Sequence, residues 1–203
     1  GMDWSYDRRD VTTETFASSW QRHSSELTGL SATMPLKESL AALTLKRDHV
    51  VDVLGVANTL YRAGGEWRTA NTDPWGVVGA LSEAGIEAGD AVIVGAGATA
   101  RAVCYGLHLA GVQNIDFVVR NPTRATETAQ IAQSLGLNAR VLNSFEDVSP
   151  GAGLVVSTLP GGSSSDLAPT EPVIDSSHLF DVGYSPWPTP MAAEWLSRGQ
   201  GVI

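Results

Sequence analysis

Lys37 and Asp73 are candidate proton-transfer residues in this sequence. Lys37 follows Thr-Met-Pro-Leu at 33–36, and Asp73 follows Asn-Thr at 71–72. A lysine and an aspartate that face each other beside a nicotinamide could move a proton while hydride leaves a carbinol carbon. A lysine in the first turn of a helix is more often a surface residue, however, and an aspartate before a helix is more often its cap. The residues alone leave both interpretations open.

A phosphate-binding turn is the second candidate feature. Residues 92–100 read Val-Ile-Val-Gly-Ala-Gly-Ala-Thr-Ala, which predicts a strand, a Gly-x-Gly-x-x-Ala turn and the start of a helix. The first glycine permits a tight turn, the second lets the backbone approach a pyrophosphate, and the small alanine lets the helix pack on the strand. Free N–H groups and the positive end of the helix dipole would then face the phosphates. A plain sheet turn is the alternative, but the βαβ context favours a dinucleotide site. Its predicted residues are Gly95, Ala96, Gly97, Ala98, Thr99 and Ala100.

The choice of cofactor depends on the tip of the following strand. An acidic residue there would bind the ribose hydroxyls of NAD, but this sequence has Arg120, Asn121 and Arg124 instead. A guanidinium can pair with the 2′-phosphate of NADP, so we expect NADP rather than NAD. The alternative is that both arginines are solvated surface charges.

Two further cofactor contacts are expected after a later strand. Thr158 and Leu159 follow the apolar run 154–156, and we expect them on the nicotinamide side of the cofactor, with an ordinary loop as the alternative. The stretch Gly161–Ser165 that comes next is rich in glycine and serine, which predicts a mobile loop.

The second half of the chain has the elements needed to position such a site. Helices are expected at 99–109, 122–135 and 189–198, and short apolar strands at 91–94, 115–119, 139–142, 154–156, 173–175 and 179–182, with a further strand starting at 201–203. Strands that alternate with helices predict a parallel, doubly wound sheet.

The first half predicts a smaller mixed α/β unit. The alternation in Trp4–Val11 suggests a strand, and the next helix has its cap at 12–14. A helix is expected over 36–46, a hairpin over 56–70, and a helix from 72 or 73 to about 84 that Gly85 ends. We therefore predict an α/β protein of two domains: a substrate-binding domain at 1–85 and a Rossmann-type NADP-binding domain at 86–203.

Composition restricts the partners. The 203 residues include 43% hydrophobic and 17% charged residues, as in globular proteins, and the formal charge of −9 argues against nucleic acid or an anionic membrane as a partner. Cys104 is the single cysteine and the four histidines lack metal-ligand spacing, so we expect neither a disulfide nor a metal. No apolar run approaches the ~20 residues that span a bilayer. We expect a cytoplasmic protein with a small-molecule substrate, and leave a homodimer open.

Five sequence blocks, in this order, resemble the shikimate dehydrogenase family. They are Ser-Ala-Thr-Met-Pro-Leu-Lys (31–37), Gly-Val-Ala-Asn-Thr (55–59), Asn-Thr-Asp-Pro-Trp-Gly (71–76), Gly-Ala-Gly-Ala-Thr-Ala-Arg (95–101) and Tyr-Ser-Pro-Trp-Pro-Thr-Pro-Met (184–191). The resemblance implies that Lys37 and Asp73 form the catalytic pair at the C3 hydroxyl of the substrate. It also implies that Thr33, Asn58 and Tyr184 contact the substrate. The implied reaction interconverts 3-dehydroshikimate with NADPH and shikimate with NADP.

The sequence departs from the family pattern in places. Ser31 stands where the family usually has asparagine, and the tip of the second strand reads Arg-Asn-Pro-Thr-Arg rather than Asn-Arg-Thr. The family's N-terminal Ser-x-Ser segment and its C-terminal closing segment have no counterpart in these 203 residues, so we expect the substrate pocket here to be incomplete. Two alternatives remain: an NAD-dependent quinate/shikimate dehydrogenase, and a non-catalytic NADP-binding regulatory module of the same fold.

Overall fold

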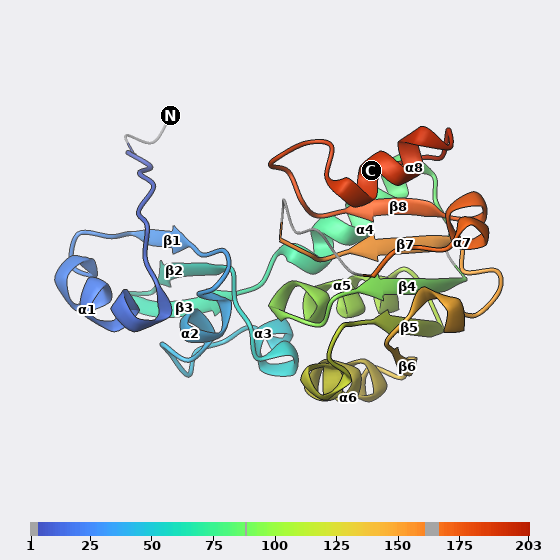
Figure 1. Ribbon diagram of the computed structural model, residues 1–203. Helices are drawn as coiled ribbons and strands as arrows, with labels where there is room; N and C mark the ends of the chain where they lie inside the picture. The colour runs from blue at the N-terminus through green and yellow to red at the C-terminus, as the bar shows by residue number, and fades with distance from the viewer. Residues whose placement is uncertain (1–3, 88, 161–166) are drawn as a thin grey trace. The chain divides into compact units, whose positions relative to one another are not determined.

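The computed structural model describes residues 4–87, 89–160 and 167–203 (Figure 1). The chain divides into two compact units, one ending at Asn71 and the other beginning at Thr72. The predicted loop at Gly161–Ser165 lies outside the described residues. Each unit has its own sheet and its own apolar core.

The first unit is a small antiparallel sheet with helices. Its elements are α1 (Thr13–His23), β1 (Gly29–Ser31), α2 (Lys37–Ala41), α3 (His49–Leu54), β2 (Thr59–Ala63) and β3 (Glu66–Ala70), with strand order β1-β2-β3. Leu60 pairs with Thr69 across β2 and β3 and both are buried, whereas the neighbouring pair Tyr61 and Arg68 is exposed. The predicted hairpin is therefore present, and its period-2 alternation turns one face to the core.

Trp4–Val11 was wrongly predicted to be a strand. The segment is described but forms no ladder, and the side chains of Trp4 and Tyr6 are 69% and 82% exposed. An alternating pattern produces a strand only where a second strand satisfies its backbone groups. Among the described strands, β1 pairs with β2 and not with this segment.

The second unit is built on a five-stranded parallel sheet. Its strands are β4 (Asp90–Val94), β5 (Asn114–Val118), β6 (Asn138–Leu142), β7 (Leu154–Ser157) and β8 (His178–Asp181), in the order β6-β5-β4-β7-β8. The order reverses between β4 and β7, which is the topological switch point where open α/β sheets bind ligands. Beyond β8, the backbone of Gly201–Ile203 runs parallel to it, with Leu179 N–H bonded to Gly201 O at 3.0 Å.

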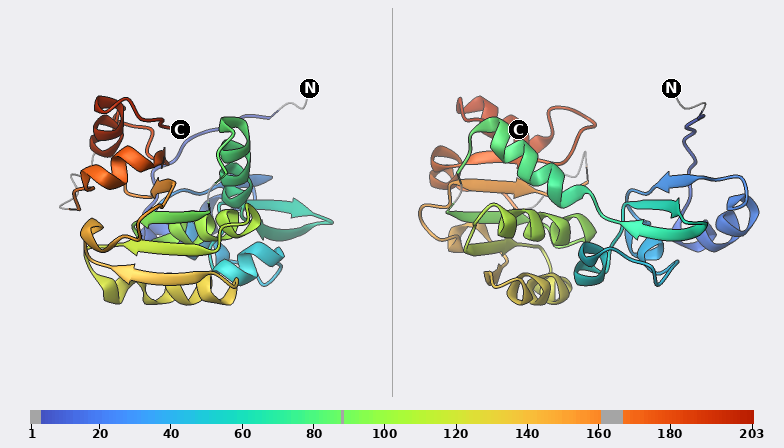
Figure 2. Two further views of the ribbon diagram at one scale, coloured as in Figure 1. Left: turned by 90° about the vertical axis from the view of Figure 1, so that its right-hand side faces the viewer. Right: turned by 180° about the vertical axis from the view of Figure 1, so that it is seen from behind.

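Helices cover both faces of this sheet, as the doubly wound prediction requires. They are α4 (Asp73–Ala84), α5 (Ala98–Leu109), α6 (Thr126–Ser134), α7 (Glu171–Ser176) and α8 (Pro190–Ser197), with short 3₁₀ turns η1 (Pro122–Ala125) and η2 (Phe145–Asp147). Ile93 and Phe117 belong to the same core cluster as residues of α4, α5 and α6. Figure 2 shows the sheet and its helices from two further sides. Val92 and Val94 point to the opposite face, into a cluster with residues of α7 and α8.

The predicted strand at Val173–Asp175 is also wrong, because these residues lie in α7. Pro172 occupies the first turn of that helix, where its fixed φ is favourable and its missing N–H has no helical partner in any case. A three-residue apolar run does not distinguish a strand from one turn of helix.

The described residues contain neither a membrane-spanning helix nor a cluster of metal-ligating side chains. No helix in the described part of the chain is both long and apolar enough to cross a membrane. Over the same residues, no group of three or more His, Cys, Asp or Glu side chains is placed to hold a metal ion.

Candidate active site

The predicted phosphate-binding turn lies at the switch point between β4 and β7. Gly95 has a φ of +100°, and a Cβ at this position would lie 2.6 Å from the Thr158 hydroxyl oxygen. That hydroxyl donates to the carbonyl of Val94 at 2.8 Å, and the backbone N–H of Thr158 donates to the same carbonyl at 2.9 Å. Gly95 is therefore required both by its backbone conformation and by the close approach of the chain after β7.

Gly97 has a different reason to be glycine. It is the N-cap of α5, with an ordinary φ of −85°, and no protein atom lies within 4 Å of where its Cβ would be. As a glycine it has no side chain with which to cap the helix. Gly97 is exposed, and the first turn of this twelve-residue helix is half-buried at Ala98 and Thr99. Because Gly97 carries no side chain, the N-terminal end of the helix has room for a phosphate group. These residues fit a dinucleotide pyrophosphate.

Helix α6 holds the turn in place from one side. The Thr128 hydroxyl donates to the carbonyl of Ala96 at 2.8 Å, and the Arg101 guanidinium on α5 is 2.8 Å from the Glu127 carboxylate on α6. Ala100 is fully buried between helix and sheet. The turn is thus connected to β4, β7 and α6, which keeps the start of α5 at a defined place.

Arg120, Asn121 and Arg124 follow β5, next to the turn in the sheet. The N–H of Gly95 donates to Val118 O at 3.1 Å, so the carboxyl ends of β4 and β5 are joined directly. Asn121 caps η1 by accepting from the N–H of Thr123 at 3.1 Å. Arg120 and Arg124 are exposed, and no described carboxylate forms an ion pair with either. Their positive charge is therefore available to an anionic ligand.

Leu159 connects the turn to a cavity of about 210 Å³. Its side chain lies 3.6 Å from the position of a Cβ on Gly95, and it also lines the cavity. Three buried or nearly buried polar side chains line the same cavity, namely those of Ser157, Asp181 and Thr189. The cavity lies where β7 and β8 end, so a ligand at the switch point would reach it from the turn.

Thr33, Lys37 and Asn58 are brought together at one end of the first unit's sheet. Asn58 O accepts from Ala32 N–H at 2.7 Å, just after β1, and Lys37 O accepts from Ala57 N–H at 2.9 Å. Thr33 is exposed and Asn58 is half-buried, whereas Lys37 begins α2 and is only 8% exposed. Residues separated by 25 positions in sequence therefore share one edge.

Asn71 belongs to the same edge and was missed as a positioning residue by the sequence analysis. It is 1% exposed, and its carboxamide donates to the carbonyl of Val56 at 3.0 Å. Asp48 accepts from the Asn71 N–H at 3.3 Å and, through its other oxygen, from the Val51 N–H at 2.7 Å. These bonds fix the chain where β3 ends, two residues before Asp73. Its place in the Asn-Thr-Asp block was the available indication.

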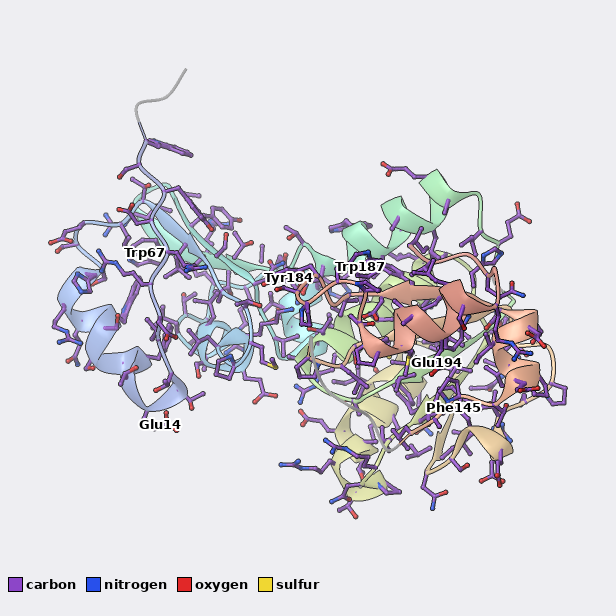
Figure 3. The ribbon with its side chains drawn as sticks, turned by 45° about the horizontal axis from the view of Figure 1, so that its top comes forward. Glu14, Trp67, Phe145, Tyr184, Trp187 and Glu194 are labelled. Carbon is purple, nitrogen blue, oxygen red and sulfur yellow. The ribbon has the colours of Figure 1, made fainter. Side chains whose placement is uncertain are left out.

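Asp73 and Tyr184 lie in the second unit. Asp73 is in the first turn of α4, where a negative charge interacts favourably with the helix dipole, and it is half-buried. Tyr184 is 84% exposed on the loop between β8 and α8, and Trp187 on the same loop is 53% exposed (Figure 3). The pairing of Lys37 with Asp73 stays a prediction, as do the substrate contacts of Thr33, Asn58 and Tyr184.

Comparisons with known proteins agree on one family, although no protein-family model matches the chain. The shikimate dehydrogenase (NADP(+)) of Sinorhizobium medicae is 34% identical over 218 residues, covering 100% of this chain and 74% of that protein. The shikimate dehydrogenase (NADP(+)) of Chelativorans sp. is 32% identical over 208 residues, covering 98% and 73%.

Solved structures give the same result. The shikimate dehydrogenase of Mycobacterium tuberculosis has a TM-score of 0.79 and 34% identity, covering 99% of this chain and 75% of that one. The Thermus thermophilus enzyme, solved in complex with NADP(H) and shikimate, has a TM-score of 0.79 and 28% identity, covering 96% and 73%. With identities above 30% across almost its whole length, this chain belongs to the shikimate dehydrogenase family.

Proposed function

We propose that this chain catalyses the reversible, NADP-dependent interconversion of shikimate and 3-dehydroshikimate. The observation that carries the proposal is the glycine turn at the switch point, in a chain whose relatives are named shikimate dehydrogenase (NADP(+)). The NAD-dependent quinate alternative and the non-catalytic alternative are not favoured by these relatives.

Residues 95–100 would hold the pyrophosphate, and Arg120, Asn121 and Arg124 the 2′-phosphate end of the cofactor. The exposed guanidiniums of Arg120 and Arg124 support NADP over NAD because a phosphate dianion gains charge-assisted bonds that a ribose hydroxyl does not. Thr158 and Leu159 would lie on the nicotinamide side. When bound, NADP supplies the hydride acceptor.

Lys37 and Asp73 would act on the C3 hydroxyl. In the oxidation of shikimate, the hydrogen on C3 leaves as hydride with the C–H electron pair and is transferred to NADP. The hydroxyl hydrogen leaves as a proton, and its electron pair stays to form the C=O bond. The products are the ketone, NADPH and one proton. Lys37 would take that proton at its neutral ε-amino nitrogen, and Asp73 would orient this amine by accepting a hydrogen bond from it. Thr33, Asn58 and Tyr184 would hold the rest of the substrate.

Three further assignments belong to this proposal. Residues 1–85 would serve the substrate and residues 86–203 the cofactor, although α4 packs with α5 in the second compact unit. The proposed partners are the small-molecule substrate and a second copy of the chain in a homodimer. Neither nucleic acid nor a membrane is proposed as a partner. The protein would act in the cytoplasm.

The test is an NADPH absorbance assay with shikimate or quinate and with NADP or NAD. We expect turnover with shikimate and NADP, and little with the other combinations. NADP binding is measured in parallel by calorimetry, and both measurements are repeated on Lys37→Ala and Asp73→Asn. The assay is run on this chain and on a version extended at both ends, and normal NADP binding without shikimate turnover in the extended version would overturn the enzymatic proposal. Unchanged turnover in both variants would leave an enzyme but remove this catalytic pair.

A further inference from the structure

Asp181 joins the two ends of the loop that carries Tyr184. It is the last residue of β8, and one carboxylate oxygen accepts from the Gly183 N–H at 2.9 Å. The other oxygen accepts from the Thr189 hydroxyl, at the end of the loop. The Thr189 hydroxyl oxygen in turn accepts from the Ala192 N–H at 3.0 Å and so caps α8.

This network is buried although the loop is not. Asp181 is 8% exposed and Thr189 is 6% exposed, whereas Tyr184 and Trp187 between them are largely in solvent (Figure 3). The backbone of Gly183 lies close to both partners, because a Cβ on Gly183 would lie 3.0 Å from the Thr189 methyl and 3.1 Å from a carboxylate oxygen of Asp181. The first and last residues of the loop are thus fixed by one side chain.

We propose that Asp181 is a positioning residue, which through Gly183 and Thr189 sets the place of Tyr184 for the substrate. The proposal deepens the proposed function and rests on it for the role of Tyr184. The carboxylate offers one acceptor to each of the two groups that face it, the Gly183 N–H and the Thr189 hydroxyl. An asparagine could still accept from the Gly183 N–H and donate to the Thr189 oxygen, whereas an alanine removes both acceptors and leaves two buried donors without a partner in this network.

Three variants separate positioning from helix capping. Thr189→Val keeps the shape but removes the hydroxyl, and Asp181→Ala removes both acceptors of the network. Thr189→Ser keeps both hydrogen bonds, so its amide exchange and its shikimate turnover should match those of the wild type. Ser144→Ala is the matched control, because the Ser144 hydroxyl caps η2 by accepting from the Glu146 N–H at 3.1 Å and lies outside this network.

The first measurement does not depend on activity. Hydrogen exchange of the Gly183 amide, followed by NMR, should be about tenfold faster in Asp181→Ala and Thr189→Val and unchanged in Thr189→Ser and Ser144→Ala. Unchanged exchange in Asp181→Ala would show that the carboxylate does not hold the loop, and would overturn the proposal.

The second measurement is a double-mutant cycle on shikimate turnover. Tyr184→Phe should lower kcat/KM for shikimate by about tenfold in the wild-type background, but by less than about threefold when Thr189 is valine. Equal losses in the two backgrounds would mean that the network does not act through Tyr184. Should the wild-type protein, extended at both ends, turn over no shikimate, the proposed function fails by itself, and the exchange rates alone decide whether Asp181 holds the loop.

Discussion

The Thr158 hydroxyl oxygen lies 2.6 Å from the point where a Cβ on Gly95 would be. This close approach joins the turn after β4 to the loop after β7 at the switch point of the parallel sheet. The two residues are 63 positions apart in the sequence, yet the position of Thr158 leaves no room for a side chain on residue 95. The glycine turn is therefore part of the packing of the second unit as well as a candidate ligand site.

Alanine substitutions at Gly95 and Gly97 should affect different properties, stability in the first case and NADP binding in the second. Gly95→Ala should lower the free energy of unfolding by about 2–4 kcal/mol, because the φ of +100° and the contact with Thr158 both oppose a side chain. Gly97→Ala should change it by less than about 1 kcal/mol, since its φ is ordinary and its Cβ meets open space. Yet it should weaken NADP binding by at least about tenfold. Urea unfolding and calorimetry measure the two effects, and wild-type NADP affinity in Gly97→Ala would contradict the pyrophosphate assignment.

Arg120 and Arg124 should determine the preference for NADP. Replacing either by glutamine should weaken NADP binding by roughly tenfold to a hundredfold, as expected for loss of a charge-assisted bond to phosphate, and leave NAD binding unchanged. Arg22→Gln, an exposed arginine on α1 in the first unit, controls for the change in net charge. Calorimetry with both cofactors tests this, and equal loss of NAD and NADP affinity would show that neither arginine reads the 2′-phosphate.

Gly106 and Gly79 make a matched pair on the packed helices α5 and α4. A Cβ on Gly106 would lie 2.7 Å from the Val77 Cβ and 2.9 Å from Pro74 O, whereas one on Gly79 would meet no atom within 4 Å. Gly106→Ala should therefore destabilise the second unit by about 1–3 kcal/mol, and Gly79→Ala should stabilise it by about 0.5–1 kcal/mol. Thermal unfolding of the two variants decides this, and a stabilising Gly106→Ala would mean that α4 and α5 pack less closely than described.

Asp116 should make the stability of the second unit sensitive to acid. Burial raises the pKa of this carboxyl, but the hydrogen bonds from the Arg140 guanidinium and the Ser149 N–H together outweigh burial and hold the pKa below its ordinary value. A group whose folded pKa is lowered stabilises the fold above its unfolded pKa of about 3.9, and that contribution disappears as the pH falls through the folded pKa.

Asp116→Asn should accordingly lower the free energy of unfolding by about 1–3 kcal/mol at neutral pH. The difference from the wild type should shrink as the pH falls below about 4. Urea unfolding over a pH series measures both quantities. A difference that stays constant across that range would assign the effect to packing rather than to the Arg140 pair.

Local patterns in the sequence determined the dinucleotide turn and the elements around it. A buried parallel strand needs a continuous apolar run and a tight turn needs glycine, so residues 91–100 indicated β4, the turn and α5 without knowledge of any distant residue. The five family blocks likewise indicated the candidate catalytic pair, Lys37 and Asp73, and the three expected substrate contacts. The hairpin and the end of α4 at Gly85 were also local, because glycine readily adopts the left-handed conformation found there.

Tertiary structure decided what depends on distant partners. Trp4–Val11 alternates like a strand but pairs with no strand in the described part of the chain, and the apolar run at 173–175 became a helical turn. Asp181 belongs to no chemical motif that we recognised, and its role appears only once Gly183 and Thr189 lie on both sides of it. Gly106 and Gly79 are alike in sequence, and only the neighbouring helix makes one of them indispensable. Such contacts join residues that the chain brings together by folding, so no spacing along the sequence could have revealed them.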